Sequence, residues 1–279
     1  MFRKRYRLIK NTVRHNVSQV LALTEKNIKL ETRFKFQLLY GFINPIITIL
    51  MPLIIFQTLF NFNKSYGPWN PENYAVFILS TYNLYLLKGI ISDFPIRLRQ
   101  EKFWKTLPAL IIAPFNRFDL LFGIFLSHLI IISIPFIIFF IMTLILYPIS
   151  LWTFIFVSFI YMLIALIFSG IGLFLGVFAI SRESIWRFLT IALKLVFWAS
   201  CISYPFEIFP ESIQSIISLN PFYYVFSILR MAWIQNNFIL TLAEYWYQFI
   251  IILVIATVLP IIAVSVFNKI FRKYGIVGY

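Results

Sequence analysis

One short segment of the sequence carries charged and aromatic side chains between two long apolar runs. It covers residues 96–117, and its side chains that could bind a partner are Arg97, Arg99, Glu101, Phe103, Trp104, Leu107 and Arg117. Aromatic rings can fill pockets on another protein, and charges around them can steer and orient the encounter. Pro108 and Pro114 interrupt the segment. We therefore expect a docking loop, and the alternative is a basic loop that contacts lipid head groups.

Lys88, Asp93 and Lys194 are charged residues within the apolar runs, where a charge needs a physical reason. Asp93 precedes Arg97 by four residues, so an ion pair along one helix explains it. Lys88 and Lys194 have two open explanations. Either their long side chains reach the membrane surface, or their ammonium groups lie on a transport path and meet an anionic group of the substrate.

Motifs for catalysis are absent from the sequence. The chain has no GxxxxGK[ST], HExxH or GxSxG motif, and its only histidines are His15 and His128. We therefore expect neither an enzyme nor a metal site. The net charge of +14 would indicate nucleic acid in a soluble protein, but in a membrane protein it is typical of basic loops that face anionic lipid. Nucleic acid is not an expected partner.

Composition indicates what must position these residues. The chain is 61% apolar and 12% charged, whereas soluble domains are about half apolar and about a quarter charged. A helix needs about 20 apolar residues to cross a hydrocarbon core about 30 Å thick. We therefore predict an all-α integral membrane protein, one domain over residues 1–279, with six transmembrane helices. The expected spans are residues 38–60, 74–95, 118–147, 152–180, 185–203 and 246–268.

The basic residues predict the orientation, because loops rich in Lys and Arg stay on the cytoplasmic side. Of the 24 Lys and Arg residues, 20 fall before residue 37, within 97–117, within 181–187 or in the tail after residue 268. The opposite loops hold only Lys64 and Arg230. We therefore expect six spans in the cell (inner) membrane with both termini in the cytoplasm.

Two segments outside the spans are expected to form helices of another kind. Residues 1–37 combine apolar and basic faces, which is typical of a helix that lies on the membrane surface or docks a partner. Residues 204–245 are apolar, and three prolines divide them: Pro205, Pro210 and Pro221. We expect outer-side re-entrant helices there, with Arg230 reaching water or pairing with Glu207 or Glu211.

Small residues within one expected span predict close helix packing. Gly170, Gly172 and Gly176 fall in the stretch SGIGLFLG. Glycines at such spacing let the backbones of membrane helices approach each other. A cofactor site is a much weaker interpretation of this pattern.

Two stretches resemble parts of a known family of permeases. Residues 41–56, GFINPIITILMPLIIF, resemble the opening of its first span. Residues 107–123, LPALIIAPFNRFDLLFG, resemble its cytoplasmic loop, with matching residues at Ala113, Pro114 and Arg117. The family is that of the membrane subunits of type-2 ABC exporters.

A third stretch extends the resemblance. Residues 204–230 are similar to the outer re-entrant segment of the permeases that export O-antigen, teichoic acid and other cell-surface polysaccharides. The matching residues are Pro205, Pro210, Asn220, Pro221 and Arg230. Those permeases often have a histidine and an acidic residue where this chain has Tyr224 and Ser227.

The resemblance implies a permease without a nucleotide site of its own. It implies that residues 96–113 form a cytoplasmic coupling helix, with Phe103, Trp104 and Leu107 in a groove of a separate ATPase. The complex would contain two copies of this chain, as a homodimer, and two copies of the ATPase. ATP and Mg²⁺ would bind to the ATPase, and this chain would carry no cofactor.

The implied substrate is a cell-surface polysaccharide or a lipid-linked glycan. Sugars stack on aromatic rings, and a lipid-linked head group brings pyrophosphate for lysines near the cytoplasmic entrance. The expected path residues are Trp69, Tyr74, Tyr82, Tyr85, Lys88 and Lys194. Two alternatives stay open: a type-2 exporter of a drug, lipid or other small amphiphile, and a membrane scaffold that transports nothing.

Overall fold

The computed structural model describes residues 2–62, 65–106 and 117–274. These residues form helices joined by short connections. In chain order the helices are α1 (Phe2–Arg33), α2 (Lys35–Phe62), α3 (Tyr74–Phe103), α5 (Arg117–Leu146), α6 (Leu151–Ser181), α7 (Glu183–Trp198), the 3₁₀ turn η1 (Phe206–Ile208), α8 (Glu211–Ile217), α9 (Pro221–Gln235), α10 (Phe238–Glu244) and α11 (Trp246–Tyr274). The predicted all-α class is confirmed for this part of the chain.

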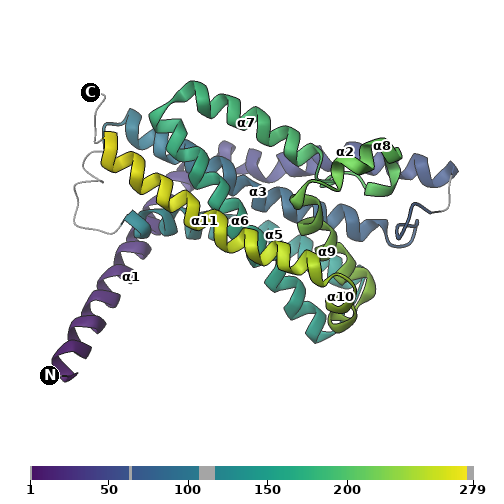
Figure 1. Cartoon of the computed structure of the whole chain (residues 1–279), viewed down its shortest axis with the longest axis horizontal. Coiled ribbons are helices and arrows are strands. Elements are labelled where there is room, and N and C mark those ends of the chain that lie inside the picture. The colour runs from purple at the N-terminus through teal and green to yellow at the C-terminus, as the bar shows by residue number, and fades with distance from the viewer. Residues whose placement is uncertain (1, 63–64, 107–116, 275–279) are drawn as a thin grey trace.

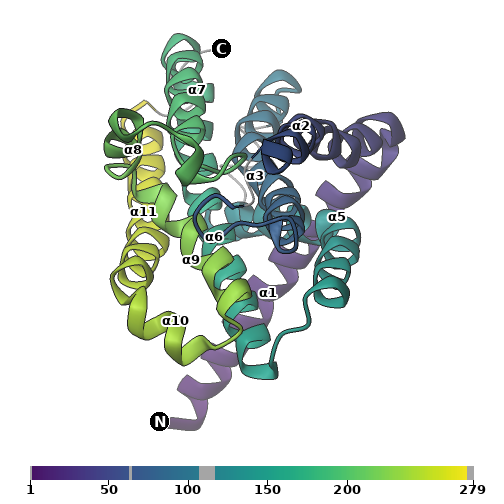
Figure 2. The ribbon, with the colours of Figure 1, turned by 90° about the vertical axis from the view of Figure 1, so that its right-hand side faces the viewer.

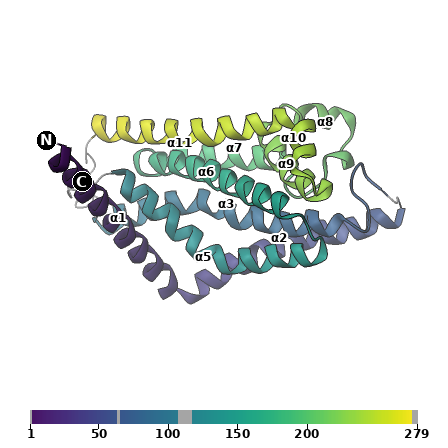
Figure 3. The ribbon, with the colours of Figure 1, turned by 90° about the horizontal axis from the view of Figure 1, so that it is seen from below.

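Five of these helices are long and apolar enough to cross a membrane. They are Leu38–Phe60 within α2, Tyr74–Phe103, Asp119–Leu146 within α5, Leu151–Ser181, and Trp246–Ile270 within α11. Each coincides with a predicted span. Figure 3 shows α2, α3, α5, α6, α7 and α11 side by side along the length of the molecule.

The remaining predicted span, residues 185–203, is shorter in the structure. Helix α7 ends at Trp198 after 16 residues, which gives about 24 Å at 1.5 Å per residue, below the core thickness of about 30 Å. Beyond it the chain turns, and Cys201 adopts a left-handed backbone conformation with φ of 54°. Six crossings therefore stay a prediction, and five candidate spans are found.

Helices α3 and α6 form the centre of the bundle. Most of their apolar stretch is buried, whereas only 17–22% of the apolar stretch of α2, α5 and α11 is buried. A Cβ atom on Gly172 would lie 2.8 Å from the carbonyl oxygen of Ile90 in α3, and one on Gly170 would lie 2.8 Å from the backbone nitrogen of Pro260 in α11. The predicted close packing around these glycines is confirmed.

Helix α1 joins the bundle only through its C-terminal half. Its N-terminal half projects away from the other helices in Figure 1. Its C-terminal half packs on α5, where a Cβ atom on Gly123 would come within 2.8 Å of Leu23 Cβ. The predicted N-terminal helix is thus present, and its position at the membrane surface stays a prediction.

Short helices gather at one end of the bundle, which faces the viewer in Figure 2. They are η1, α8, α9 and α10, and together they occupy the segment 204–245. Asparagine caps explain where two of them begin: Asn220 Oδ1 accepts from the Phe222 N–H at 3.1 Å, and Asn237 Oδ1 accepts from the Ile239 N–H at 3.1 Å. Short helices were predicted here, but their depth in the membrane is not tested.

Two further boundaries differ from the expected ones. Helix α3 does not end at residue 95 but continues to Phe103, so the first part of the predicted docking loop is helical. Pro95 lies inside the helix, which neighbouring membrane helices tolerate. A single non-helical residue, Arg182, separates α6 from α7.

Candidate substrate cavity and docking surface

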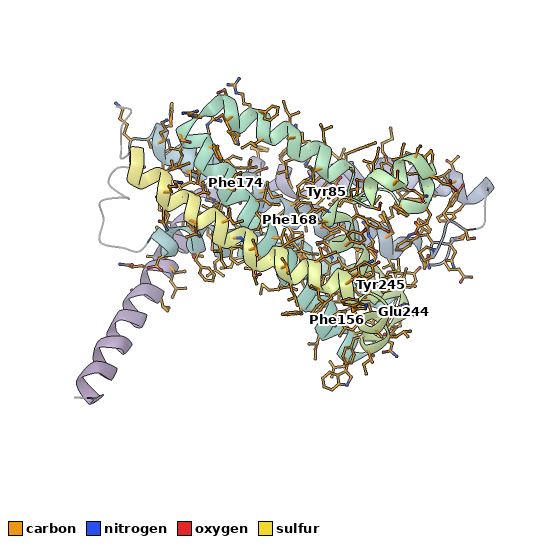
Figure 4. The ribbon with its side chains drawn as sticks, in the orientation of Figure 1. Tyr85, Phe156, Phe168, Phe174, Glu244 and Tyr245 are labelled. Carbon is orange, nitrogen blue, oxygen red and sulfur yellow. The ribbon has the colours of Figure 1, made fainter. Side chains whose placement is uncertain are left out.

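A half-open cavity of about 150 Å³ lies between α3, α7 and the turn that follows α7. It is lined by Tyr85, Lys88, Lys194, Phe197, Trp198, Cys201, Ile202, Ser203, Tyr204 and Phe209. Figure 4 labels Tyr85, which lies close to the end of α7 in that view. The cavity therefore combines cations, hydroxyl groups and aromatic rings.

The structure brings three of the six predicted path residues to this cavity: Tyr85, Lys88 and Lys194. Lys88 Nζ lies 4.5 Å from the centroid of the Phe197 ring and 5.1 Å from that of the Tyr85 ring. The Tyr85 hydroxyl forms a hydrogen bond of 2.7 Å with Ser203 Oγ. The lysine is thus held by aromatic faces, which attract cations.

The other predicted path residues lie elsewhere. Trp69 and Tyr82 are 2% and 1% exposed. Tyr82 stacks on Phe139 and donates to the carbonyl oxygen of Phe42 at 3.2 Å. Tyr74 packs against Phe60, 5.6 Å between ring centroids. Trp69 and Tyr82 are core residues in the single chain, and Tyr74 is half-buried against the core.

Sequence reasoning missed four aromatic residues that line the cavity: Phe197, Trp198, Tyr204 and Phe209. They come from the end of α7 and the turn beyond it. Because aromatic residues make up 20% of the sequence, ring content alone could not separate these four from rings that face lipid. The available signal was their position beside Pro205 and Pro210, where a turn was expected.

Arg230 is buried rather than directed to water. Its Nη1 donates to the carbonyl oxygen of Cys201 at 2.8 Å, and its Nη2 donates to Ile202 O at 2.6 Å and to Thr81 Oγ1 at 3.0 Å. The guanidinium also lies 3.6 Å from the centroid of the Phe77 ring. Burial lowers the pKa of Arg230 to about 10, so it stays charged at neutral pH.

The prediction that Arg230 reaches water or pairs with a nearby glutamate is therefore wrong. No ion pair joins Arg230 to Glu207 or Glu211 among the residues that the structure describes. Glu207 is half-buried, and this partial burial raises the pKa of its carboxyl group. Arg230 instead fixes the turn after α7 against α3 and α9, because carbonyl oxygens left without helical partners accept hydrogen bonds from its guanidinium.

The other residues of the predicted re-entrant motif lie at helix starts. Asn220 caps α9, and its Nδ2 also donates to the carbonyl oxygen of Val196 in α7 at 2.7 Å. Pro221 is the first residue of α9, Pro210 precedes α8, and Pro205 precedes η1. A proline at such a position loses no helical hydrogen bond. The motif thus sets the path of the chain after α7.

Two predicted docking residues already have partners within the chain. Arg97 and Glu101 are 8% and 7% exposed, and both reach across to α1. Arg97 pairs with Glu31, and Glu101 pairs with Lys26 at 2.5 Å between Oε1 and Nζ. Their charges therefore fix α1 to the end of α3 rather than face outward.

A chain of ionisable side chains continues from this contact into the bundle. Glu31 forms an ion pair with Arg97, and Asp93 forms a hydrogen bond with Nδ1 of His128 in α5. The predicted pair of Asp93 and Arg97 is present, but its atoms are 4.0 Å apart. Burial, followed by the charge of Asp93, raises the pKa of the Glu31 carboxyl group.

The remaining predicted docking residues divide into three groups. Phe103 and Trp104 are 84% and 45% exposed, so both rings are open to a partner. Arg99 lies with its guanidinium 4.7 Å from the Trp186 ring of α7. Leu107 and the side chain of Arg117 lie outside the described residues. Binding of an ATPase at these positions stays a prediction.

The side chains that could bind a metal ion are dispersed in the described part of the chain. No three His, Cys, Asp or Glu side chains there lie together so that they could hold a metal ion. The expectation that the chain binds no metal or other cofactor stays a prediction.

Comparison with known protein families matches residues 18–234 to the family described as ABC-2 type transporter. The match covers α2, α3, α5, α6, α7 and α9, and with them the cavity and the α1 contact. The chain belongs to the ABC-2 type transporter family. No curated protein is similar enough to the chain to count as a match.

Membership fixes the coarse function. The chain is a type-2 ABC permease, a multi-pass membrane subunit of an ABC exporter that partners with an ABC ATPase. It is the transmembrane component and not the nucleotide-binding ATPase. The expectation of an exporter subunit is therefore confirmed, and the kind of substrate is not decided by the family.

Proposed function

We propose that the chain exports a cell-surface polysaccharide or a lipid-linked glycan as the permease subunit of an ATP-driven exporter. The observation that carries the proposal is the wall of aromatic rings around the cavity. Tyr85, Trp198, Tyr204 and Phe209 come from three different segments and line one space. Sugars offer flat C–H faces to such rings, and their hydroxyl groups need polar neighbours such as Ser203.

We propose further that two copies of the chain form the export path. The cavity is half-open in the single chain. Helices α2 and α7 both carry exposed apolar side chains, among them Leu50 and Met51 in α2 and Ile191 and Leu195 in α7. A second copy against these faces would close the cavity toward lipid. Lipid would cover the same apolar faces if the chain were a monomer. Cross-linking between two copies distinguishes a dimer from lipid contact.

In the proposed complex the chain lies in the cell (inner) membrane with both termini in the cytoplasm. Two ATPase subunits bind ATP and Mg²⁺ and dock where α3 ends. The exposed rings of Phe103 and Trp104 support this docking site, because buried aromatic anchors dominate many protein interfaces. The lysine and arginine bias of the loops supports the orientation.

Transport into inverted membrane vesicles tests the substrate. Vesicles that contain the chain and its ATPase receive a radiolabelled lipid-linked oligosaccharide, and we measure ATP-dependent protection from an added glycosidase. Tyr85→Ala should reduce protection about ten-fold, because it removes the ring, whereas Tyr85→Phe keeps the ring and should transport well. A contribution of about 1–1.5 kcal/mol from one stacked ring gives this factor.

The same vesicles decide between the proposal and its alternatives. ATP-dependent accumulation of a fluorescent phospholipid or an amphiphilic drug, with no glycan protection, would replace the glycan with a small amphiphile. No ATP-dependent movement of any of these would contradict export of these substrate classes. A vesicle set without the ATPase is the control.

A further inference from the structure

Two ammonium groups face the same cavity without a carboxylate beside them. Lys88 comes from α3 and Lys194 from α7, and none of the described residues that line the cavity is acidic. Within residues 2–62, 65–106 and 117–274, the ion pairs involve neither lysine. The hydroxyl groups of Tyr85 and Ser203, which also line the cavity, form a hydrogen bond with each other.

This arrangement is costly unless an anion joins it. Like charges repel, and the repulsion grows in surroundings of low dielectric constant such as the interior of a membrane protein. The rings of Phe197 and Tyr85 attract Lys88, but they carry no net charge. A ligand that brings negative charge would relieve the repulsion between the two lysines.

The position of the cavity differs from the cytoplasmic entrance where we expected these lysines. Lys88 lies in the middle of α3, 14 residues after Tyr74 and 15 before Phe103. Lys194 lies four residues before the end of α7, next to the turn fixed by Arg230. The site therefore belongs to the half of the bundle that carries η1, α8, α9 and α10, away from the end of α3 that meets α1.

The size and walls of the cavity indicate the ligand. A volume of about 150 Å³ suits a small head group. Trp198 and Phe209 offer an apolar exit beside the lysines. An anionic head on an apolar chain matches both features.

We propose that Lys88 and Lys194 form a subsite for the phosphate or diphosphate group of an amphiphile. The proposal rests on the proposed export function and adds where the head group of the substrate is held during transport. Two sources share this chemistry, a lipid-linked glycan and an anionic phospholipid of the membrane. Two lysines on different helices would place the oxygens of the group between them.

Binding of farnesyl diphosphate to the purified permease–ATPase complex in phosphatidylcholine nanodiscs tests the subsite. Calorimetry should show that Lys88→Gln and Lys194→Gln each weaken binding about ten-fold or more, since hydrogen bonds to charged groups are lost. Lys88→Arg and Lys194→Arg should bind within a few-fold of the unchanged chain. Lys269→Gln, an exposed lysine in α11, is the matched control and should have no effect.

Two further arms identify the part of the ligand that is recognised. Farnesol, which has the same apolar chain without phosphate, should bind at least ten-fold more weakly than farnesyl diphosphate. Replacing part of the phosphatidylcholine with phosphatidylglycerol distinguishes the two sources. If phosphatidylglycerol weakens the binding of farnesyl diphosphate, the site also accepts bulk anionic lipid. If it does not, the site is specific for diphosphate carriers.

Specific outcomes would overturn the subsite. Equal binding of farnesol, or unchanged diphosphate binding in both glutamine variants, would remove the role of the lysines. If Lys88→Gln does not fold, Lys194→Gln at the more exposed position gives the same test. Binding is measured without transport, so the two proposals are tested separately. The diphosphate subsite can be correct even when no glycan is exported, and glycan export can be correct even when the subsite is not.

Discussion

Arg230 joins three segments that are far apart in the sequence. It donates to the turn at Cys201 and Ile202 and to Thr81 in α3. A lysine carries the same charge but cannot match the forked geometry of a guanidinium. We expect Arg230→Lys to destabilise the folded protein by about 2–4 kcal/mol, because buried carbonyl groups lose their donors.

The stability of this variant is measured as thermal aggregation in detergent. Arg182→Lys is the matched control, since Arg182 is exposed between α6 and α7. It should leave the midpoint temperature nearly unchanged. An Arg230→Lys protein as stable as the control would mean that water or lipid takes over the hydrogen bonds.

Residues whose role depends on distant contacts were the hardest to predict. Arg97 and Glu101 were expected to face a partner, and instead they pair with α1, 66 and 75 residues away in sequence. Neither periodicity nor composition contains that information. The cavity lysines were identified as candidates because a charge in an apolar run is unusual at any position.

At the scale of elements, the glycines of α6 determine how close its neighbours lie. A methyl group on Gly172 would meet the backbone of Ile90 and Ile91, which cannot move aside easily. We expect Gly172→Ala to destabilise the protein by about 1–3 kcal/mol, the usual cost of overpacking. In contrast, a Cβ on Gly41 of α2 meets nothing within 4 Å, so Gly41→Ala should stabilise its helix by about 0.5–1 kcal/mol.

Thermal unfolding of the two variants, side by side, checks this difference. The two substitutions are chemically identical and both lie in membrane helices, so any difference between them reports packing. If both variants unfolded at the same temperature, α3 and α6 would not be in close contact at Gly172.

The contact between α1 and α3 is an interaction that charge reversal can test. Lys26 and Glu101 face each other at 2.5 Å. Lys26→Glu or Glu101→Lys alone places like charges together and should loosen α1. The double reversal restores opposite charges, and a coupling energy of about 0.5–3 kcal/mol is expected for residues in direct contact.

Hydrogen–deuterium exchange in residues 17–33 measures this effect. Exchange should speed up in each single variant and slow down again in the double variant. Lys29 pairs with Glu25 within α1 itself, so reversing that pair is a control that should not affect the contact with α3. Additive effects of Lys26 and Glu101 would show that the pair does not hold α1.

The elements themselves were largely predictable because bilayer thickness fixes the length of an apolar run. Five predicted spans match helices to within a few residues at most boundaries. The exceptions have tertiary causes. Helix α7 stops at Trp198 because the following turn is held by Arg230, and α3 continues past Pro95 because α1 and α5 cover its end. Local sequence shows neither contact.

For the whole molecule, the number of crossings decides where the two ends lie. Six crossings place both termini on one side, whereas five place them on opposite sides and would bring Lys269 outside, against the charge bias. We expect six, with α7 and the turn after it completing the crossing. Single cysteines at Ser212, Asn237 and Lys269 in a Cys201→Ser background test this.

An impermeant thiol reagent is added to intact cells and labelling is compared with that after permeabilisation. Positions 212 and 237, both exposed, should be labelled from outside, and position 269 only after permeabilisation. Labelling of position 269 in intact cells would establish an odd number of crossings. Labelling of positions 212 and 237 from outside shows that the reagent reaches the cells, so these two positions are the controls for position 269.

The joint at Arg182 has a mechanical consequence. Helix α6 is wedged between α3 and α11 by its glycines, so it can act only as a fixed frame. Helix α7 is attached to that frame through one extended residue, with φ of −148° and ψ of 96°. Rotation at this joint would swing Lys194 relative to Lys88, and it would have to open the hydrogen bond between Asn220 and Val196 at the far end of α7. Spin labels on α6 and α7 would record such a stroke as a change in distance between nucleotide states of the partner ATPase.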